Sequence, residues 1–78
     1  MTTFTGVVCA VPKTDADGDV IFQLRPDGQT QAIVFLLPQA SKQQVIIEIN
    51  VNERYTVTGV SDQGKAFFRV ASISKAFR

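Results

Sequence analysis

Two strand-like runs, separated by a tight turn, set the fold class of this 78-residue chain. In VIFQLR (20–25) every second residue is Val, Phe or Leu, so an extended strand presents one apolar face. PDGQ (26–29) has the residues of a β-turn, with Gly28 supplying a positive φ. TQAIVFLL (30–37) predicts the returning strand. The sequence therefore predicts a β-hairpin at the centre of a sheet protein.

The other segments continue this β pattern. FTGVVCAV (4–11), RYTVTGV (54–60) and AFFRVASI (66–73) are predicted strands, with Gly6 at a bulge or bend. The connector contains a short helical stretch at 39–44, and residues 45–49 read equally as helix or strand. We expect an all-β fold, a small five- to six-stranded Greek-key barrel with one short helical or irregular connector. Residues 1–78 form one domain, because the chain is too short for a second core.

Composition argues against an enzyme. The chain has no histidine and one cysteine, so the commonest general base and the usual zinc ligands are missing. No phosphate-binding glycine loop or nucleophile motif is present. DADGD (15–19) offers carboxylates, but its glycine falls at the wrong position for a calcium loop, which favours an ordinary hairpin loop. We expect a non-enzymatic protein with no cofactor and no metal.

The setting is expected to be cytoplasmic. Cys9 is alone and lies in an apolar run, so it is predicted to be a buried, inert thiol in a reducing compartment. No signal peptide is evident in MTTFTG, and the longest apolar stretch is far shorter than a membrane span. We therefore expect no membrane partner.

The order of these features resembles the OB-fold (oligonucleotide/oligosaccharide-binding) superfamily. The matching segments are the opening TGVV, the hairpin DGDVIFQLRPDGQTQAIVF, the 38–50 connector, and the closing RYTVTGVSDQGKAFFRVASI. The resemblance covers nearly the whole chain and implies nucleic-acid binding, although the first loop carries three acids where many members carry basic or aromatic residues. An SH3-like barrel is the alternative fold.

KAFFRVAS (65–72) supplies the best candidate for a binding residue. If Phe68 faces the core with Val70, then Phe67 lies outside between two cations, as a base-stacking ring requires. Two alternatives stay open: Phe67 packs under the connector or on a partner, or the register is reversed and Phe67 lies inside.

The resulting hypothesis is binding of single-stranded DNA or RNA by stacking and phosphate contacts. The expected binding residues are Phe67, Arg69, Lys65, Arg54, Arg25, Thr56 and Gln23. The chain has three basic against five acidic residues in 1–50, and five against two in 51–78, for a net charge of +1. We therefore expect weak or oligomer-dependent binding. DNA and RNA are not distinguished by the sequence.

A protein-interaction or assembly module is the alternative function. If Ala32, Val34 and Leu36 line the barrel, the other side chains of the third strand emerge together as an apolar patch suited to a partner subunit. These possible interface residues are Ile33, Phe35 and Leu37.

Overall fold

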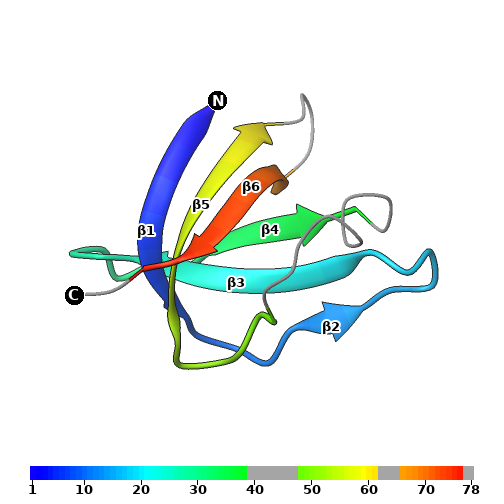
Figure 1. Cartoon of the computed structure of the whole chain (residues 1–78), viewed down its shortest axis with the longest axis horizontal. Coiled ribbons are helices and arrows are strands. Elements are labelled where there is room, and N and C mark those ends of the chain that lie inside the picture. Colours follow the sequence, from blue (N-terminus) through cyan, green and yellow to red (C-terminus); the bar gives the residue numbers. More distant parts are fainter. Residues whose placement is uncertain (39–47, 62–65, 77–78) are drawn as a thin grey trace.

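The computed structural model describes residues 1–38, 48–61 and 66–76, which contain six strands and no helix (Figure 1). The strands are β1 (Thr2–Val8), β2 (Lys13–Thr14), β3 (Val20–Pro26), β4 (Ile33–Leu37), β5 (Arg54–Ser61) and β6 (Phe68–Lys75). The predicted connector at 39–44 and its continuation at 45–47 lie outside the described residues. Residues 48–50 belong to neither helix nor strand.

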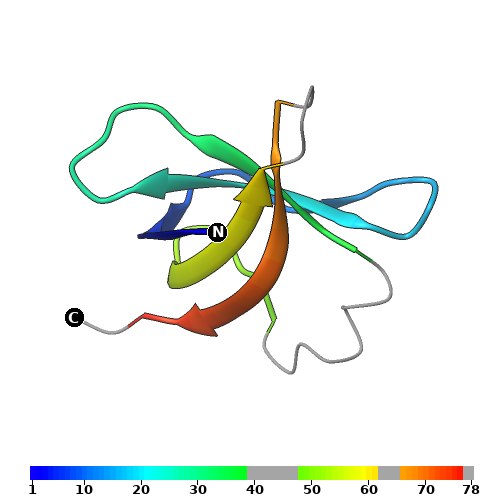
Figure 2. The same ribbon diagram turned by 90° about the horizontal axis from the view of Figure 1, so that it is seen from above.

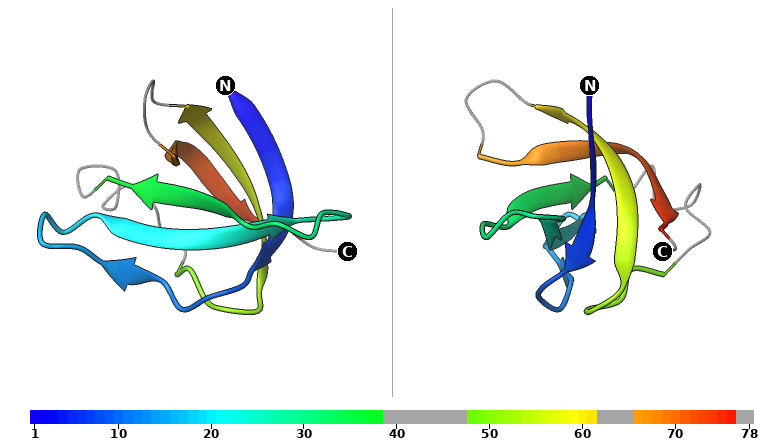
Figure 3. Two further views of the ribbon diagram at one scale, coloured as in Figure 1. Left: turned by 180° about the vertical axis from the view of Figure 1, so that it is seen from behind. Right: turned by 90° about the vertical axis from the view of Figure 1, so that its left-hand side faces the viewer.

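Five of the strands close into a barrel. The sheet order is β1-β5-β6-β4-β3-β2, and β3 also pairs back to β1, so only the two-residue β2 lies outside the ring. The β4–β6 pair is parallel and all others are antiparallel. In Figures 1 and 3, β3 and β4 cross beneath the rising strands β1, β5 and β6, and Figure 2 shows the same arrangement from above. The predicted small all-β barrel is confirmed.

Closure depends on a close approach at Gly6. In register Gly6 faces Tyr55 of β5 on one side and Pro26 of β3 on the other. A Cβ at this position would lie 2.0 Å from the carbonyl oxygen of Arg25, so only glycine fits. The irregular pairing lies elsewhere, between Thr58 and Gly59 of β5.

The core fills the barrel with side chains from five strands. Its buried members are Val8, Phe22, Leu24, Phe35, Leu37, Tyr55, Val57 and Val70. Phe35 stacks on Phe22 at 5.4 Å between ring centroids, and Phe4 meets both Phe35 and Phe68 edge to face. The predicted inward placement of Phe22, Leu24, Phe68 and Val70 is confirmed.

Tyr55 ties the chain before β5 to the core, and its predicted core position is confirmed. Its ring is fully buried, while its hydroxyl reaches the part-buried edge. That hydroxyl donates to the Glu48 carbonyl and accepts from the Asn50 amide, both at 2.8 Å. Asn52 follows with a φ of 69°, which completes the turn predicted at NVNE (50–53).

The predicted outward face of β4 is wrong. Phe35 is 0% exposed, Leu37 is 2% exposed, and Ile33 is half-buried and packs on the core. The outer positions belong to Val34 and Leu36, so the two faces of the strand are exchanged. The physical reason is that IVFLL has no polar residue to mark its outer side. The aromatic ring fills the barrel better than the smaller Val34 does, and the expected interface is thereby lost.

Cys9 is exposed, so its predicted burial is also wrong. The first strand ends at Val8, and the Cys9 amide then donates to the Gln23 carbonyl at 3.0 Å. The last three residues of the predicted 4–11 strand are therefore apolar but lie beyond the end of β1. The returning strand likewise begins at Ile33, three residues later than predicted.

Candidate functional site

The outer surface of three neighbouring strands gathers several of the predicted binding residues. Gln23 of β3 is paired with Val34 of β4, and Leu36 of β4 is paired with Arg69 of β6. Side chains in one such row point to the same side of the sheet. We call this surface the β3–β4–β6 face, and it consists of Ile21, Gln23, Arg25, Val34, Leu36 and Arg69.

The composition of the β3–β4–β6 face is mixed. Gln23, Arg25 and Arg69 are exposed, whereas Val34 and Leu36 are half-buried between them. An apolar strip flanked by an amide and two guanidinium groups offers contact area for flat rings and donors for anions. The predicted exposure of Gln23 and Arg25 is confirmed by the alternation along β3.

Phe67 lies directly before β6, at the edge of this face. Phe68 is paired with Phe35 and packs on the core, so one step back the parallel register sets Phe67 beside Val34. Phe67 itself is half-buried. The reversed register, with Phe67 in the core and Phe68 outside, is thereby wrong. Lys65, the other predicted cation here, lies outside the described residues.

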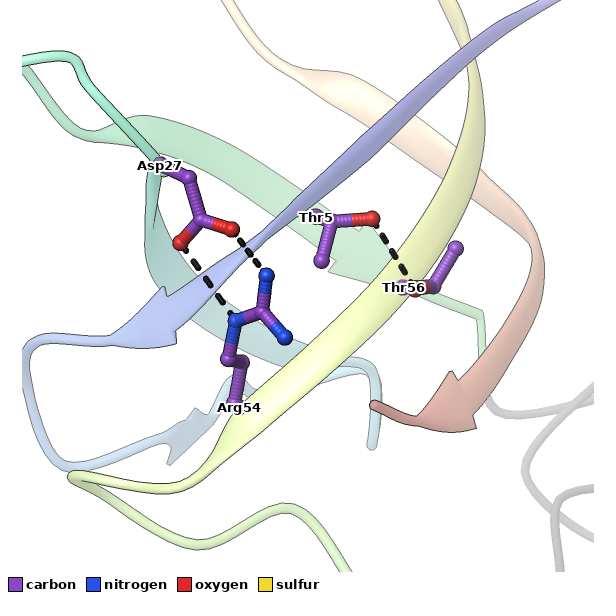
Figure 4. A network of polar contacts seen from close by, with 4 residues as sticks. All are labelled: Thr5, Asp27, Arg54 and Thr56. Carbon is purple, nitrogen blue, oxygen red and sulfur yellow. Dashed lines mark hydrogen bonds and ion pairs between the residues drawn. The ribbon is translucent and has the colours of Figure 1, made fainter. Parts of the chain in front are cut away.

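Arg54 stands two strands away from Arg25. Val7 of β1 is paired with Arg25 on one side and with Arg54 on the other. The backbones of the two arginines therefore lie on either side of β1, ~10 Å apart, which is two strand spacings. Arg54 forms an ion pair with Asp27, the residue that follows β3 (Figure 4). Its Nε donates to Asp27 Oδ1 at 3.4 Å and its second guanidinium nitrogen donates to Oδ2.

This ion pair shifts the pKa of both partners. The hydrogen bond from Arg54 lowers the pKa of Asp27 below its usual range, and the same contact raises the pKa of Arg54. Both groups are therefore charged at neutral pH and compensate each other. Arg25 differs, since it forms no ion pair with any residue in the described ranges. Sequence reasoning missed the pair because Asp27 reads as a turn residue.

Thr56 belongs to a different surface. Its hydroxyl bonds that of Thr5 at 3.0 Å (Figure 4), and Thr3 and Thr58 repeat the contact at 2.9 Å. The same rows continue on β6, because Thr56 is paired with Ser74. This row of hydroxyls covers β1, β5 and β6. The sequence signal for these hydroxyl pairs is the Thr-X-Thr pattern, which occurs in both TFT (3–5) and TVT (56–58). Sequence reasoning did not identify it.

The acidic loop is explained by its own hydrogen bonds. The carboxylates of Asp15, Asp17 and Asp19 lie within 4.8 Å of one another. Asp15 Oδ1 accepts the amides of Asp17 at 2.9 Å and Asp19 at 3.0 Å, and Gly18 has a φ of 83°. This geometry agrees with the predicted hairpin loop.

The sequence matches no protein-family model and no curated protein. In the part of the chain that the structure describes, no helix is long and apolar enough to cross a membrane.

Proposed function

We propose that this chain is an OB-like barrel that binds single-stranded nucleic acid on the β3–β4–β6 face and catalyses no reaction. OB-folds are five-stranded Greek-key barrels that bind oligonucleotides over their second and third strands. The barrel order β1-β3-β4-β6-β5, with its parallel β4–β6 pair, supports the OB-like assignment. In it β3 and β4 are the second and third barrel strands.

The observation that carries the proposal is the register across these strands. It sets Gln23 and Arg25 on one side of Val34 and Leu36, and Arg69 on the other. Unpaired bases expose flat apolar rings with polar edges, and the phosphates that link them are anionic. An apolar strip bordered by guanidinium groups matches both parts, with Phe67 at its edge as the stacking ring.

The predicted contacts are not equivalent in this arrangement. Arg25 and Arg69 are exposed on the face itself, so we assign them the phosphate contacts. Arg54 is held by Asp27 and lies across β1, which makes it a secondary contact. Thr56 points into the hydroxyl rows and is not assigned to the face.

Fluorescence anisotropy of labelled oligo-dT and oligo-U at several salt concentrations tests the proposal. We expect saturable binding that weakens with salt, because phosphate contacts release counterions. Arg25→Gln and Arg69→Gln should each weaken binding and reduce the salt slope by ~0.7, the contribution of one single-strand phosphate.

Lys75→Gln is the matched control. It removes one positive charge at the far end of β6, where Lys75 bonds Glu53 at 2.9 Å. If Lys75→Gln weakens binding as much as Arg25→Gln does, net charge and not the β3–β4–β6 face is responsible. Flat binding curves at low salt for both oligonucleotides would refute the function altogether.

A further inference from the structure

A hollow of about 210 Å³ opens beside the β3–β4–β6 face. It lies between β3 and the chain that leads into β2. The residues lining it are Ala10, Val11, Lys13, Ile21, Phe22 and Gln23. Its size is below the ~300–1,000 Å³ of pockets for drug-sized ligands, so it suits a single ring system.

The hollow arises because the two segments do not pair continuously. The Cys9 amide bonds the Gln23 carbonyl, and Lys13 is the partner of Ile21 in the β2–β3 register. Three residues, 10–12, therefore lie opposite a single residue of β3, Phe22. Pro12 has no N–H to donate to the ladder, so this segment arches away from the sheet.

The walls of the hollow are apolar and its rim is polar. Val11 is 69% exposed, an unusual position for a large apolar side chain, and the half-buried Ile21 lines the same hollow. Lys13 contributes an exposed ammonium group, and Gln23 contributes an exposed amide with both donor and acceptor. Gln23 also belongs to the β3–β4–β6 face, so the hollow and that face are continuous.

We propose that this hollow receives one unpaired nucleobase of the bound strand. Val11 and Ile21 contact the faces of the base, the Gln23 amide hydrogen-bonds its polar edge, and Lys13 contacts an adjoining phosphate. The inference rests on the proposed function and deepens it. It adds a hydrogen-bonding contact to the edge of one base, whereas the contacts proposed above are ring stacking and phosphate binding. Arg25, the next outward residue along β3 after Gln23, continues the phosphate track.

The test compares variants on two ligands of equal phosphate number, an oligo-dT and a strand of the same length made of abasic sites. Val11→Ser removes an exposed apolar wall without touching the core, and Val51→Ser is the matched control, since Val51 is 36% exposed in the turn before β5. We expect Val11→Ser to weaken oligo-dT binding by at least about fourfold, the effect of removing one CH₂ group from contact with the base. The abasic strand should bind both valine variants equally.

Arg25→Gln separates this inference from the proposed function. It should weaken binding of both ligands, because it acts on phosphates. If Arg25→Gln does so while Val11→Ser has no effect on oligo-dT, the base-binding hollow is refuted and the proposed function stands. If wild-type protein binds neither ligand, both are refuted.

A titration followed by backbone amide NMR distinguishes the source of the base. We expect the amides of Ala10, Val11 and Gln23 to shift at much lower concentrations of oligo-dT than of thymidine 5′-monophosphate, because the strand adds the Arg25 and Arg69 contacts. Saturation by the mononucleotide at equal or lower concentration would overturn the assignment to a strand.

Discussion

Gly6→Ala is the substitution that most directly tests how the barrel closes. A Cβ at Gly6 would lie 2.0 Å from the Arg25 carbonyl oxygen, 2.6 Å from its carbonyl carbon and 2.6 Å from Pro26 Cα. All three atoms belong to backbone, so no side-chain rotation relieves the overlap. β1 has to move away from β3 by about 1 Å before the contact reaches even the 3.0 Å at which real Cβ atoms begin to be found.

That movement falls on the pairs that close the ring, Gly6 with Pro26, Val7 with Arg25 and Val8 with Leu24. Overpacking a closely packed site costs ~1–3 kcal/mol. Weakening one or two backbone hydrogen bonds adds ~0.5–1.5 kcal/mol each. We therefore expect Gly6→Ala to lower the free energy of unfolding by about 2–5 kcal/mol, a large part of the ~4–12 kcal/mol that is typical for a domain of this length.

Urea unfolding measures this loss, and Gly28→Ala is the matched control. Gly28 has a φ of 78° but no atom within 4 Å of its would-be Cβ. That substitution should therefore lower the free energy of unfolding only by the ~1–2 kcal/mol that a left-handed backbone costs alanine. If Gly6→Ala destabilises the protein less than Gly28→Ala does, the close approach does not control closure and the reasoning is wrong.

Three further predictions address the core edge, the ion pairs and the binding face. Tyr55→Phe should lower the free energy of unfolding by about 1–3 kcal/mol in urea, because it leaves part-buried backbone groups without their hydroxyl partner; an unchanged midpoint would contradict this. Lysine and arginine partners lower the pKa of Glu53 and Asp27, so their stabilisation is present above pH ~4 and is lost as pH falls through the folded-state values. Acid unfolding of Asp27→Asn should accordingly depend less on pH than that of the wild type, and an identical profile would show that the pair is not coupled to folding. Phe67→Ala should weaken oligo-dT binding by about 5- to 150-fold in anisotropy, the range for one stacked base, whereas Phe67→Tyr should keep it; equal loss in both variants would argue against stacking.

The fold was predictable wherever polar residues mark one side of a strand. In β3, Gln23 and Arg25 separate the outer face from the core, and in β5 the threonines do the same for Tyr55 and Val57. In β4 every residue is apolar, so the sequence pattern does not show which residues face the core. What decides it is the space inside the closed barrel, where Phe35 stacks on Phe22, and that space is a property of the whole ring.

The candidate site was predictable only residue by residue. Exposure of Arg25 follows from β3 alone, but its neighbours do not. Arg54 meets Asp27 only because β1 passes between β5 and β3 and closes the ring. The parallel pairing that brings Arg69 beside Leu36 joins residues that lie 33 positions apart in the sequence. Such contacts depend on topology, which local patterns do not contain.

Charge placement sets the strength of the proposed binding. The excess of cations in residues 51–78 does not form one basic patch in the described structure, because Arg54 pairs with Asp27 and Lys75 with Glu53. The cations assigned to the strand are Arg25 and Arg69 on the face and Lys13 at the hollow.

Three such contacts predict a salt slope of about −2, or about a twentyfold loss of affinity between 50 and 200 mM salt. One copy of the chain is therefore expected to bind weakly at physiological salt. A measured slope much steeper than −2 requires more cations than the β3–β4–β6 face and the hollow of one copy supply together. Several copies would then share one strand, and the slope should fall back toward −2 when the oligonucleotide is shortened to the length that one barrel covers.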